Sequence, residues 1–264
     1  MSHIRPPLRS LRAVAAAALL LPAMAGAQGA SLPSAESLVA KHVAAIGGEA
    51  AVRAHSSIRM TGTFEMAAAG LRGEFTVVGA APDRNALTIV LPGVGEIRSG
   101  YDGIGAWEFN PMVGARLVQG KELARVAEDA DFYGSTLRSQ KGVASRETVE
   151  RTTLGGVPCH RVKVIWKSGR ESHECYAVEG GLLVALQSTY EGPMGTMETT
   201  QLLGGYETFG GVKHATVLRQ QMMGAEQVLT VTAVEYDAVS DDAFTPPPAI
   251  RTLRDQAKGT PGAR

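Results

Sequence analysis

Apolar and polar residues alternate with a period of two along most of the chain from residue 57 onward, as in strands that bury one face. In the first run Ile58, Met60 and Phe64 fall on one face, while Arg59 and Thr61 fall on the other. The runs are bounded by Gly, Pro, Asp or Asn and fall at 57–66, 71–77, 87–91, 97–101, 107–109, 146–154, 159–166, 172–178, 182–190, 194–203, 215–222 and 227–236. We therefore predict a mostly β chain, an antiparallel meander of about 11 to 12 strands with one apolar face.

Helical spacing interrupts this alternation in two places. Residues 34–46 have apolar side chains at helical intervals after a candidate cap at Ser34, and Gly47-Gly48 separates them from a shorter turn at 49–53. Residues 119–131 predict a short amphipathic helix. So few helical residues cannot cover a sheet of this length, and the sheet must curl or close. We predict a strongly curved, incompletely closed β-barrel that is plugged by these two helices.

The first 27 residues have the order of an export signal. Arg5, Arg9 and Arg12 precede an apolar run at 13–21, and small residues lead up to Ala27. This order predicts a secretory signal peptide at 1–27 that is cleaved after Ala27. Because no cysteine lies at the cleavage site and no Arg-Arg pair is present, we expect general secretory export to the periplasm without lipidation.

The rest of the chain predicts one domain and a tail. The strand-like runs form one continuous series, so residues 28–248 are assigned to a single domain. Prolines 246–248 cannot lie inside a strand, and the residues after them are polar. We expect residues 249–264 to be a disordered tail.

The charge balance narrows the choice of partners. Lysine and arginine total 26 and aspartate and glutamate total 26, so the formal net charge is zero, and no basic block is present. Nucleic acid and anionic membrane surfaces are therefore not favoured as partners. We expect the protein to be a monomer.

Two cysteines remain after export, Cys159 and Cys175. They flank a tight turn at 167–170, which places them on adjacent strands of a hairpin. An oxidising compartment favours a disulfide between them, but a slip in register would separate their Cα atoms beyond the ~7 Å that a bridge tolerates. A zinc site that also uses His160 and His173 is disfavoured, because neighbouring residues of a strand point to opposite faces. We expect no metal and no cofactor.

No catalytic signature is present. The sequence lacks a Gly-x-Ser-x-Gly elbow, a His-Glu-x-x-His helix, a Ser-x-x-Lys motif and a phosphate-binding Gly-Lys-Ser/Thr loop. Tyr101-Asp102-Gly103 is better explained as a hairpin turn than as a site. We therefore expect no enzyme, although a triad dispersed along the chain stays open, because triads are spatial arrangements.

Several short motifs occur in the order that is typical of one group of exported proteins. They are Ala45-Ile46-Gly47-Gly48, the run 57–63, Gly100-Tyr101-Asp102-Gly103 with Trp107 and Asn110-Pro111, the run 206–213, and Asp241-Asp242-Ala243-Phe244-Thr245-Pro246-Pro247. Together they resemble the outer-membrane lipoprotein-sorting group, which is similar to the LolA/LolB carriers. The resemblance implies an unclosed antiparallel β-barrel with helices as a lid and an apolar concave face that holds acyl chains. His214 stands where the group usually has a proline, and no arginine matches the one that tethers the lid in the carriers.

An apolar cavity on the strand faces is the candidate ligand site. Its predicted lining is Met60, Phe64, Phe75, Val77, Leu87, Ile89, Trp107 and Phe109. An ordinary packed core would explain the same residues. The leading hypothesis is a periplasmic carrier that binds lipid or lipoprotein acyl chains and works with an inner- or outer-membrane protein. The alternatives are an accessory module that docks onto a protein partner and, third, an uncharacterised hydrolase.

Overall fold

The computed structural model describes residues 31–192, 195–222 and 224–259. These residues form fifteen strands, five α-helices and two short 3₁₀ turns, at Ala67–Ala69 and Asp241–Phe244. The strands are β1 (Ser57–Met66), β2 (Leu71–Ala80), β3 (Arg84–Leu91), β4 (Gly95–Tyr101), β5 (Ala106–Asn110), β6 (Gly114–Leu117), β7 (Val143–Leu154), β8 (Val157–Trp166), β9 (Glu171–Ala177), β10 (Leu183–Gly192), β11 (Gly195–Gly204), β12 (Glu207–Phe209), β13 (Val212–His214), β14 (Val217–Met222) and β15 (Ala225–Tyr236). The helices are α1 (Ala35–Ala45), α2 (Glu49–Arg53), α3 (Gly120–Asp129), α4 (Phe132–Leu137) and α5 (Pro248–Gly259).

One antiparallel sheet contains thirteen of these strands. Its order is β6-β5-β4-β3-β2-β1-β15-β14-β11-β10-β9-β8-β7, and it is unclosed, with β6 and β7 as its edges. The mostly β class and the unclosed antiparallel sheet are therefore confirmed, but the strands do not form one continuous meander, because β1 pairs with β15 and the sheet is open between β6 and β7. The predicted strand number is too low, because it omits the four-residue β6 and the separate hairpin of β12 and β13.

The first two helices form as predicted. The Ser34 hydroxyl accepts a hydrogen bond from the Ser37 backbone N–H at 3.2 Å, which caps α1. The helix stops before Gly47, whose φ of +118° suits glycine, and a Cβ there would lie 2.3 Å from the carbonyl oxygen of Gly211. Glycine at this position therefore ends α1 and lets the loop after β12 pack closely against it.

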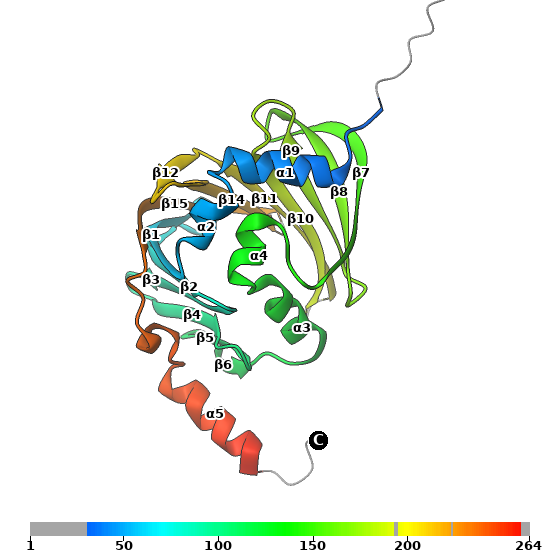
Figure 1. Ribbon diagram of the computed structural model, residues 1–264. Coiled ribbons are helices and arrows are strands. Elements are labelled where there is room, and N and C mark those ends of the chain that lie inside the picture. The colour runs from blue at the N-terminus through cyan, green and yellow to red at the C-terminus, as the bar shows by residue number, and fades with distance from the viewer. Residues whose placement is uncertain (1–30, 193–194, 223, 260–264) are drawn as a thin grey trace, which may run out of the picture. The chain divides into compact units, whose positions relative to one another are not determined.

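The connection between the two sheet edges contains two helices rather than the one predicted at 119–131. The Asp131 carboxylate accepts a hydrogen bond from the Gly134 N–H at 2.9 Å, so it stops α3 and caps α4. Helix α3 contacts both β5 and β10, which lie eight positions apart in the sheet. In a flat sheet those strands would be roughly 38 Å apart at ~4.8 Å per strand, several times a helix diameter. The sheet must therefore bend around α3, as Figure 1 shows.

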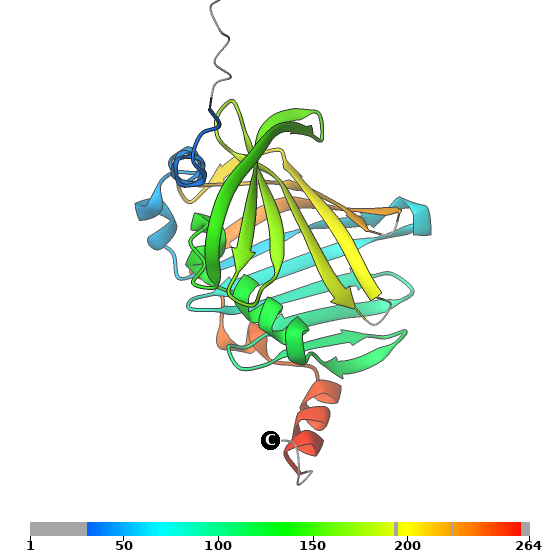
Figure 2. The ribbon, with the colours of Figure 1, turned by 90° about the vertical axis from the view of Figure 1, so that its right-hand side faces the viewer.

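Twist accompanies this bend. Strands β1–β4, from one half of the sheet, and β7–β10, from the other half, run in clearly different directions in Figure 2. A right-handed twist between neighbouring strands accumulates to such a difference over many strands. The face that carries α3 and α4 is called the inner face below, and the other is the outer face.

The C-terminal segment corrects the expectation of a disordered tail. Residues 248–259 form α5, which contacts β5 and β6. Ile250 is fully buried, and Arg254 forms an ion pair with Asp102 in the β4–β5 turn. Pro248 opens the helix, where its missing N–H is harmless, and so the prolines start a helix instead of excluding one. Residues 260–264 lie outside the described residues.

The predicted signal peptide at 1–27, with its cleavage after Ala27, also lies outside the described residues, since these begin at Ser31. Within the described part of the chain, no helix combines the length and the apolar character that a membrane crossing by a helix requires.

Candidate functional site

The apolar half of the inner face lies on β1, β2 and β3. Met60 pairs with Val77 and Val77 with Leu87, while Phe75 pairs with Ile89, so these side chains project from the same face. Phe64 and Phe75 are only 5% and 3% exposed and pack in one cluster with Ile89. Six of the eight predicted lining residues thus lie together on one face. We call Met60, Phe64, Phe75, Val77, Leu87 and Ile89 the apolar half.

Trp107 and Phe109 do not join this group. Trp107 pairs with Gly100, which pairs with Ala86, which in turn pairs with Val78. Ala86 and Val78 precede and follow Leu87 and Val77 by one residue in their strands, so this row, with Trp107, lies on the face opposite to the apolar half. A Cβ on Gly100 would lie 2.7 Å from the Trp107 ring, so the indole covers that glycine on the outer face. Phe109 follows two residues later in β5 and shares this face.

A cavity of about 210 Å³ adjoins the apolar half. It lies beneath α4, and its apolar lining includes Ile58, Met60, Val77, Phe132 and Val212. A Cβ on Gly79 would lie 3.5 Å from the Phe132 ring, so a small residue in β2 lets α4 approach the sheet. Of the predicted residues, Met60 and Val77 line this cavity, whereas Phe64 and Phe75 are packed in the neighbouring cluster.

The inner face becomes polar towards β9. One ladder runs from Glu174 through Leu186 and Gln201 to Gln220, and Ser172, Ser188 and Thr199 form a parallel row. A second cavity, of about 450 Å³, is lined by these residues except Glu174 and extends to Arg138 and Arg170. We call Ser172, Glu174, Ser188, Thr199, Gln201 and Gln220 the polar half. Both cavities touch Asp129 and Ser135, so they meet at the junction of α3 and α4.

A buried carboxylate anchors the polar half. The Glu174 side chain is 1% exposed, and Arg138 at the end of α4 donates to its Oε1 from Nε at 3.0 Å and also from Nη2. The Arg146 guanidinium of β7 lies 3.6 Å from Glu174 Oε2, to which the Tyr176 hydroxyl donates. Two arginines and a phenol thus surround one carboxylate, and α4 is tied to β9.

These contacts shift the protonation of the cluster. Burial alone would raise the pKa of Glu174, but the charges of Arg138 and Arg146 and the hydrogen bonds from Tyr176 and Arg138 outweigh it and lower that pKa. Burial and the nearby Glu174 charge raise the pKa of Tyr176 well above its usual value. Burial, helped by the charge of Arg138, lowers the pKa of His42 in α1 to about 4. His42 Nδ1 accepts the Leu183 N–H at 3.2 Å, as a neutral imidazole can.

Further ion pairs hold α3 across the opening of the sheet. Arg116 of β6 binds Glu122 at 2.7 Å, and Arg170 of the β8–β9 turn binds Asp129 at 2.8 Å and Glu128 at 3.3 Å. The Arg170 guanidinium also lies 3.9 Å from the centre of the Trp166 ring. Helix α3 is therefore fixed by charge to the edge strand β6 and to the β8–β9 turn near the other edge of the sheet.

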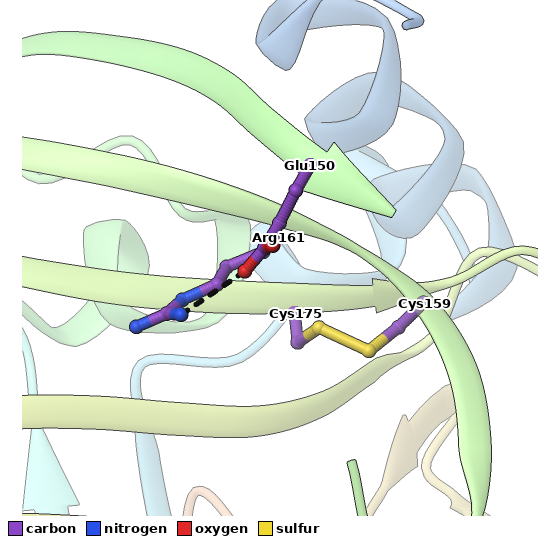
Figure 3. Close-up of a disulfide and its surroundings, with 4 residues drawn as sticks. All are labelled: Glu150, Cys159, Arg161 and Cys175. Carbon is purple, nitrogen blue, oxygen red and sulfur yellow. Dashed lines mark hydrogen bonds and ion pairs between the residues drawn. A yellow bond between two sulfur atoms is a disulfide. The ribbon is translucent and has the colours of Figure 1, made fainter. Parts of the chain in front are cut away.

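The predicted disulfide forms on the outer face between β8 and β9, as Figure 3 shows. Cys175 pairs with Arg161 and Cys159 with Ala177, so the cysteines are diagonal neighbours with Cα atoms 5.6 Å apart. Arg161 also binds Glu150 of β7 at 3.1 Å beside the bridge. The bridged sulfurs cannot ligate zinc as thiolates. Among the described residues, no group of three or more His, Cys, Asp or Glu side chains is arranged to hold a metal.

Ser56, His55 and Asp237 come together, but not as a catalytic triad. Ser56 Oγ donates to Asp237 at 3.0 Å rather than to the histidine. His55 Nδ1 lies 2.9 Å from Asp237 and Nε2 lies 2.9 Å from the Gly210 carbonyl, so neither ring nitrogen is available as a base for the serine. The hydrogen bonds to Gly210 and Asp237 raise the pKa of His55. This cluster ties three loops together at one end of the sheet.

The sequence interpretation missed the arginine–glutamate cluster. Its signal was Glu174, a charged residue at a position of β9 where the alternation calls for a buried side chain. Arg138 and Arg146 lie 36 and 28 positions earlier, counted from their numbers, and only the fold brings them to the same carboxylate. Arg138 ties α4, which lies over the inner face, to β9.

Comparison with solved structures identifies the fold. No family model matches the chain, and no curated protein matches it in sequence. A LolA superfamily protein from Nitrosomonas europaea is similar in structure, with a TM-score of 0.52 and 13% identity over 81% of this chain and 99% of that chain. A DUF1329 family protein from Desulfovibrio piger has a TM-score of 0.53 and 13% identity over 80% of this chain and 96% of its own. The resemblance drawn from sequence is thus confirmed for the fold, which is similar to that of this LolA superfamily protein.

Proposed function

We propose that this chain is a periplasmic, non-enzymatic carrier that holds the acyl chain of a lipid or lipoprotein on the inner face of its sheet. The observation that carries the proposal is the apolar cavity of about 210 Å³ between the apolar half and α4. Burial of an acyl chain contributes about 0.8 kcal/mol per methylene, so a ligand can bind there without a charged contact. The similarity of the fold to a LolA superfamily protein supports the same function.

In this proposal α3 and α4 are the lid. They connect the two edges of the unclosed sheet and lie over both cavities. Arg116 and Arg170 attach α3 through ion pairs whose carboxylates are partly exposed, whereas Arg138 anchors α4 to the buried Glu174. In this proposal α3 is the part of the lid that opens. Export to the periplasm is supported by the Cys159–Cys175 disulfide, because disulfides persist in oxidising compartments.

The experiment is uptake of a dansyl-labelled fatty acid, measured by fluorescence, with a matched pair of variants in β2. Val77 lines the apolar cavity, and Thr76 next to it points to the outer face. Val77→Glu should abolish uptake, since a carboxylate in an apolar cavity is costly and displaces acyl contacts. The Thr76→Glu variant should take up the fatty acid as the parent protein does. Failure of the parent to bind any acyl ligand would overturn the carrier function.

Docking onto a protein partner is the second candidate. It is favoured by the β5–β6 turn, where Met112 and Val113 are 68% and 84% exposed. Large apolar side chains at such a tip are typical of contact surfaces. Loss of function in a Met112→Asp/Val113→Asp variant that still takes up fatty acid would favour this candidate.

A further inference from the structure

The polar half gives the inner face a second chemistry that an acyl carrier does not need. Its cavity, about 450 Å³, is larger than the apolar one and is lined by side chains that form hydrogen bonds. Burying a hydrocarbon against Gln201 and Gln220 would strip water from their amides and return no hydrogen bond. An acyl chain alone is therefore a poor match for this cavity.

Each arginine that lines this cavity already has a carboxylate partner. Arg138 binds Glu174, Arg170 binds Glu128 and Asp129, and Arg125 contacts Asp129 at 3.4 Å. An anionic headgroup would have to compete with these carboxylates for the guanidinium groups. A cationic headgroup would face carboxylates that arginines already neutralise. Apart from Trp166, Leu186 and His173, the other side chains that line the cavity carry amides and hydroxyls.

Those groups form a surface that can both donate and accept hydrogen bonds. Gln220 Oε1 accepts from Gln227 Nε2 at 2.8 Å, and the hydroxyls of Ser188 and Thr199 lie 3.0 Å apart. The Gln201 amide has no hydrogen-bond partner within the described part of the chain. Clustered hydroxyl groups, which both donate and accept, match such a surface. A peptide matches this surface less well. An extended peptide forms main-chain hydrogen bonds with an edge strand, whereas these side chains lie on strands in the interior of the sheet.

We propose, on the basis of the carrier function above, that the occupant is an amphiphile with an uncharged, polyhydroxylated headgroup such as a sugar. The headgroup binds the polar half through Gln201 and Gln220, and the acyl chain lies in the apolar cavity. The two cavities meet at Asp129 and Ser135, so the bond between headgroup and acyl chain lies at this junction. The inner face thus selects its ligand by both ends.

The test compares three lipids with identical acyl chains: diacylglycerol, monoglucosyl diacylglycerol and phosphatidylglycerol. The parent protein should bind the glucosyl lipid at least tenfold more tightly than diacylglycerol, since two hydrogen bonds of ~1 kcal/mol each give a factor of this order. The double variant Gln201→Leu/Gln220→Leu should lose this preference and bind diacylglycerol at least as tightly as the parent does. A folding defect would instead weaken the binding of both lipids.

Gln221→Leu is the matched control. It is the same substitution one position further along β14, but Gln221 pairs with Thr200 on the outer face and is exposed. Its preference should equal that of the parent. Equal binding of glucosyl lipid and diacylglycerol by the parent, or tightest binding of phosphatidylglycerol, would overturn the headgroup assignment while the carrier function stands.

Two further measurements test a free sugar and a lipopeptide as alternative ligands. Free glucose should not displace the glucosyl lipid at millimolar concentration, and displacement would show a sugar site that does not need the chain. A diacylated lipopeptide should bind less tightly than the glucosyl lipid, and the reverse order would assign the polar half to peptide. Binding of none of these lipids would overturn the carrier function itself.

Discussion

The apolar half and the polar half belong to the same face of one sheet, yet they are stabilised in different ways. Phe64 and Phe75 pack with Ile89 in one buried cluster that excludes water, so this part of the apolar half resembles an ordinary hydrophobic core. The polar half depends on Glu174 and the arginines around it, and it leaves the larger cavity open. One sheet can thus combine a rigid wall with a polar, solvent-accessible wall. In the apolar half Phe64 and Phe75 serve stability while Met60 and Val77 line the apolar cavity, and the polar half is free to serve recognition.

The largest difference should appear when the same carboxylate is placed in each half. Phe64→Glu should cost more than about 5 kcal/mol, because loss of a buried Phe side chain alone costs about 3–5 kcal/mol and a buried charge adds to it. Gln201→Glu should change stability by less than about 1 kcal/mol, since this side chain faces the polar cavity. Urea midpoints of the two variants measure the difference. Similar losses in both would mean that the two halves are equally packed.

The ion cluster should be nearly as sensitive as the core. Glu174→Gln keeps the shape of the side chain but leaves Arg138 and Arg146 buried without a counter-charge, so we expect a loss of about 3–5 kcal/mol. Glu171→Gln, in the same strand, is the control, because that side chain is 52% exposed and should contribute within about 0.5 kcal/mol. A Glu174→Gln protein with the urea midpoint of the parent would show that the cluster does not stabilise this half.

The disulfide should support the polar half in particular. It closes a short loop between β8 and β9, with a sequence separation of 16, and should contribute about 3 kcal/mol in the chain-entropy picture. Cys159→Ala/Cys175→Ala should lower the urea midpoint, and amide exchange should accelerate more in β8 and β9 than in β1 and β2. Uniform acceleration would mean that both halves unfold as one unit. Two free thiols in unfolded, unreduced parent protein would contradict the bridge.

Sequence patterns predicted the sheet better than its short elements. Alternation is visible only over several residues, so the ten-residue β1 and β2 were found, whereas β6, with four residues, and β12 and β13, with three each, were not. Helix α4 has six residues, too few to show a helical period. Long half-buried strands thus leave a stronger mark in a sequence than the turns and short helices that position the site.

The candidate residues were grouped correctly only in part, because short-range patterns do not show how strands are joined. Tyr101 pairs with Ala106 across the β4–β5 turn, so odd and even residues exchange faces there, and Trp107 points to the outer face although Leu87 points inward. Alternation within a strand cannot reveal such an exchange. The arginines that meet Glu174 come from other elements, so only the folded chain assembles the polar half.

The smallest expected effect is a loss of stability as the pH falls. His42, which packs above the polar half with Arg138 and Glu174 near it, has its pKa lowered to about 4. Between pH 7 and pH 5 the unfolded chain binds a proton at this residue and the folded chain does not, so stability falls as the pH falls, by about 2 kcal/mol for a shift from 6.5 to 4.

His42→Gln should remove this share of the pH dependence, because the glutamine oxygen can still accept the Leu183 N–H and carries no titrating proton. Burial also lowers the pKa of His214, beside the apolar cavity, to about 4, so the variant keeps the part due to that residue. Glu174 contributes only at lower pH, since its pKa lies below the usual carboxyl value. Urea unfolding at pH 7 and pH 5 should therefore show a smaller loss in the variant than in the parent. An equal loss in both would mean that His42 is protonated in the folded protein, and that the polar half admits water beneath α1.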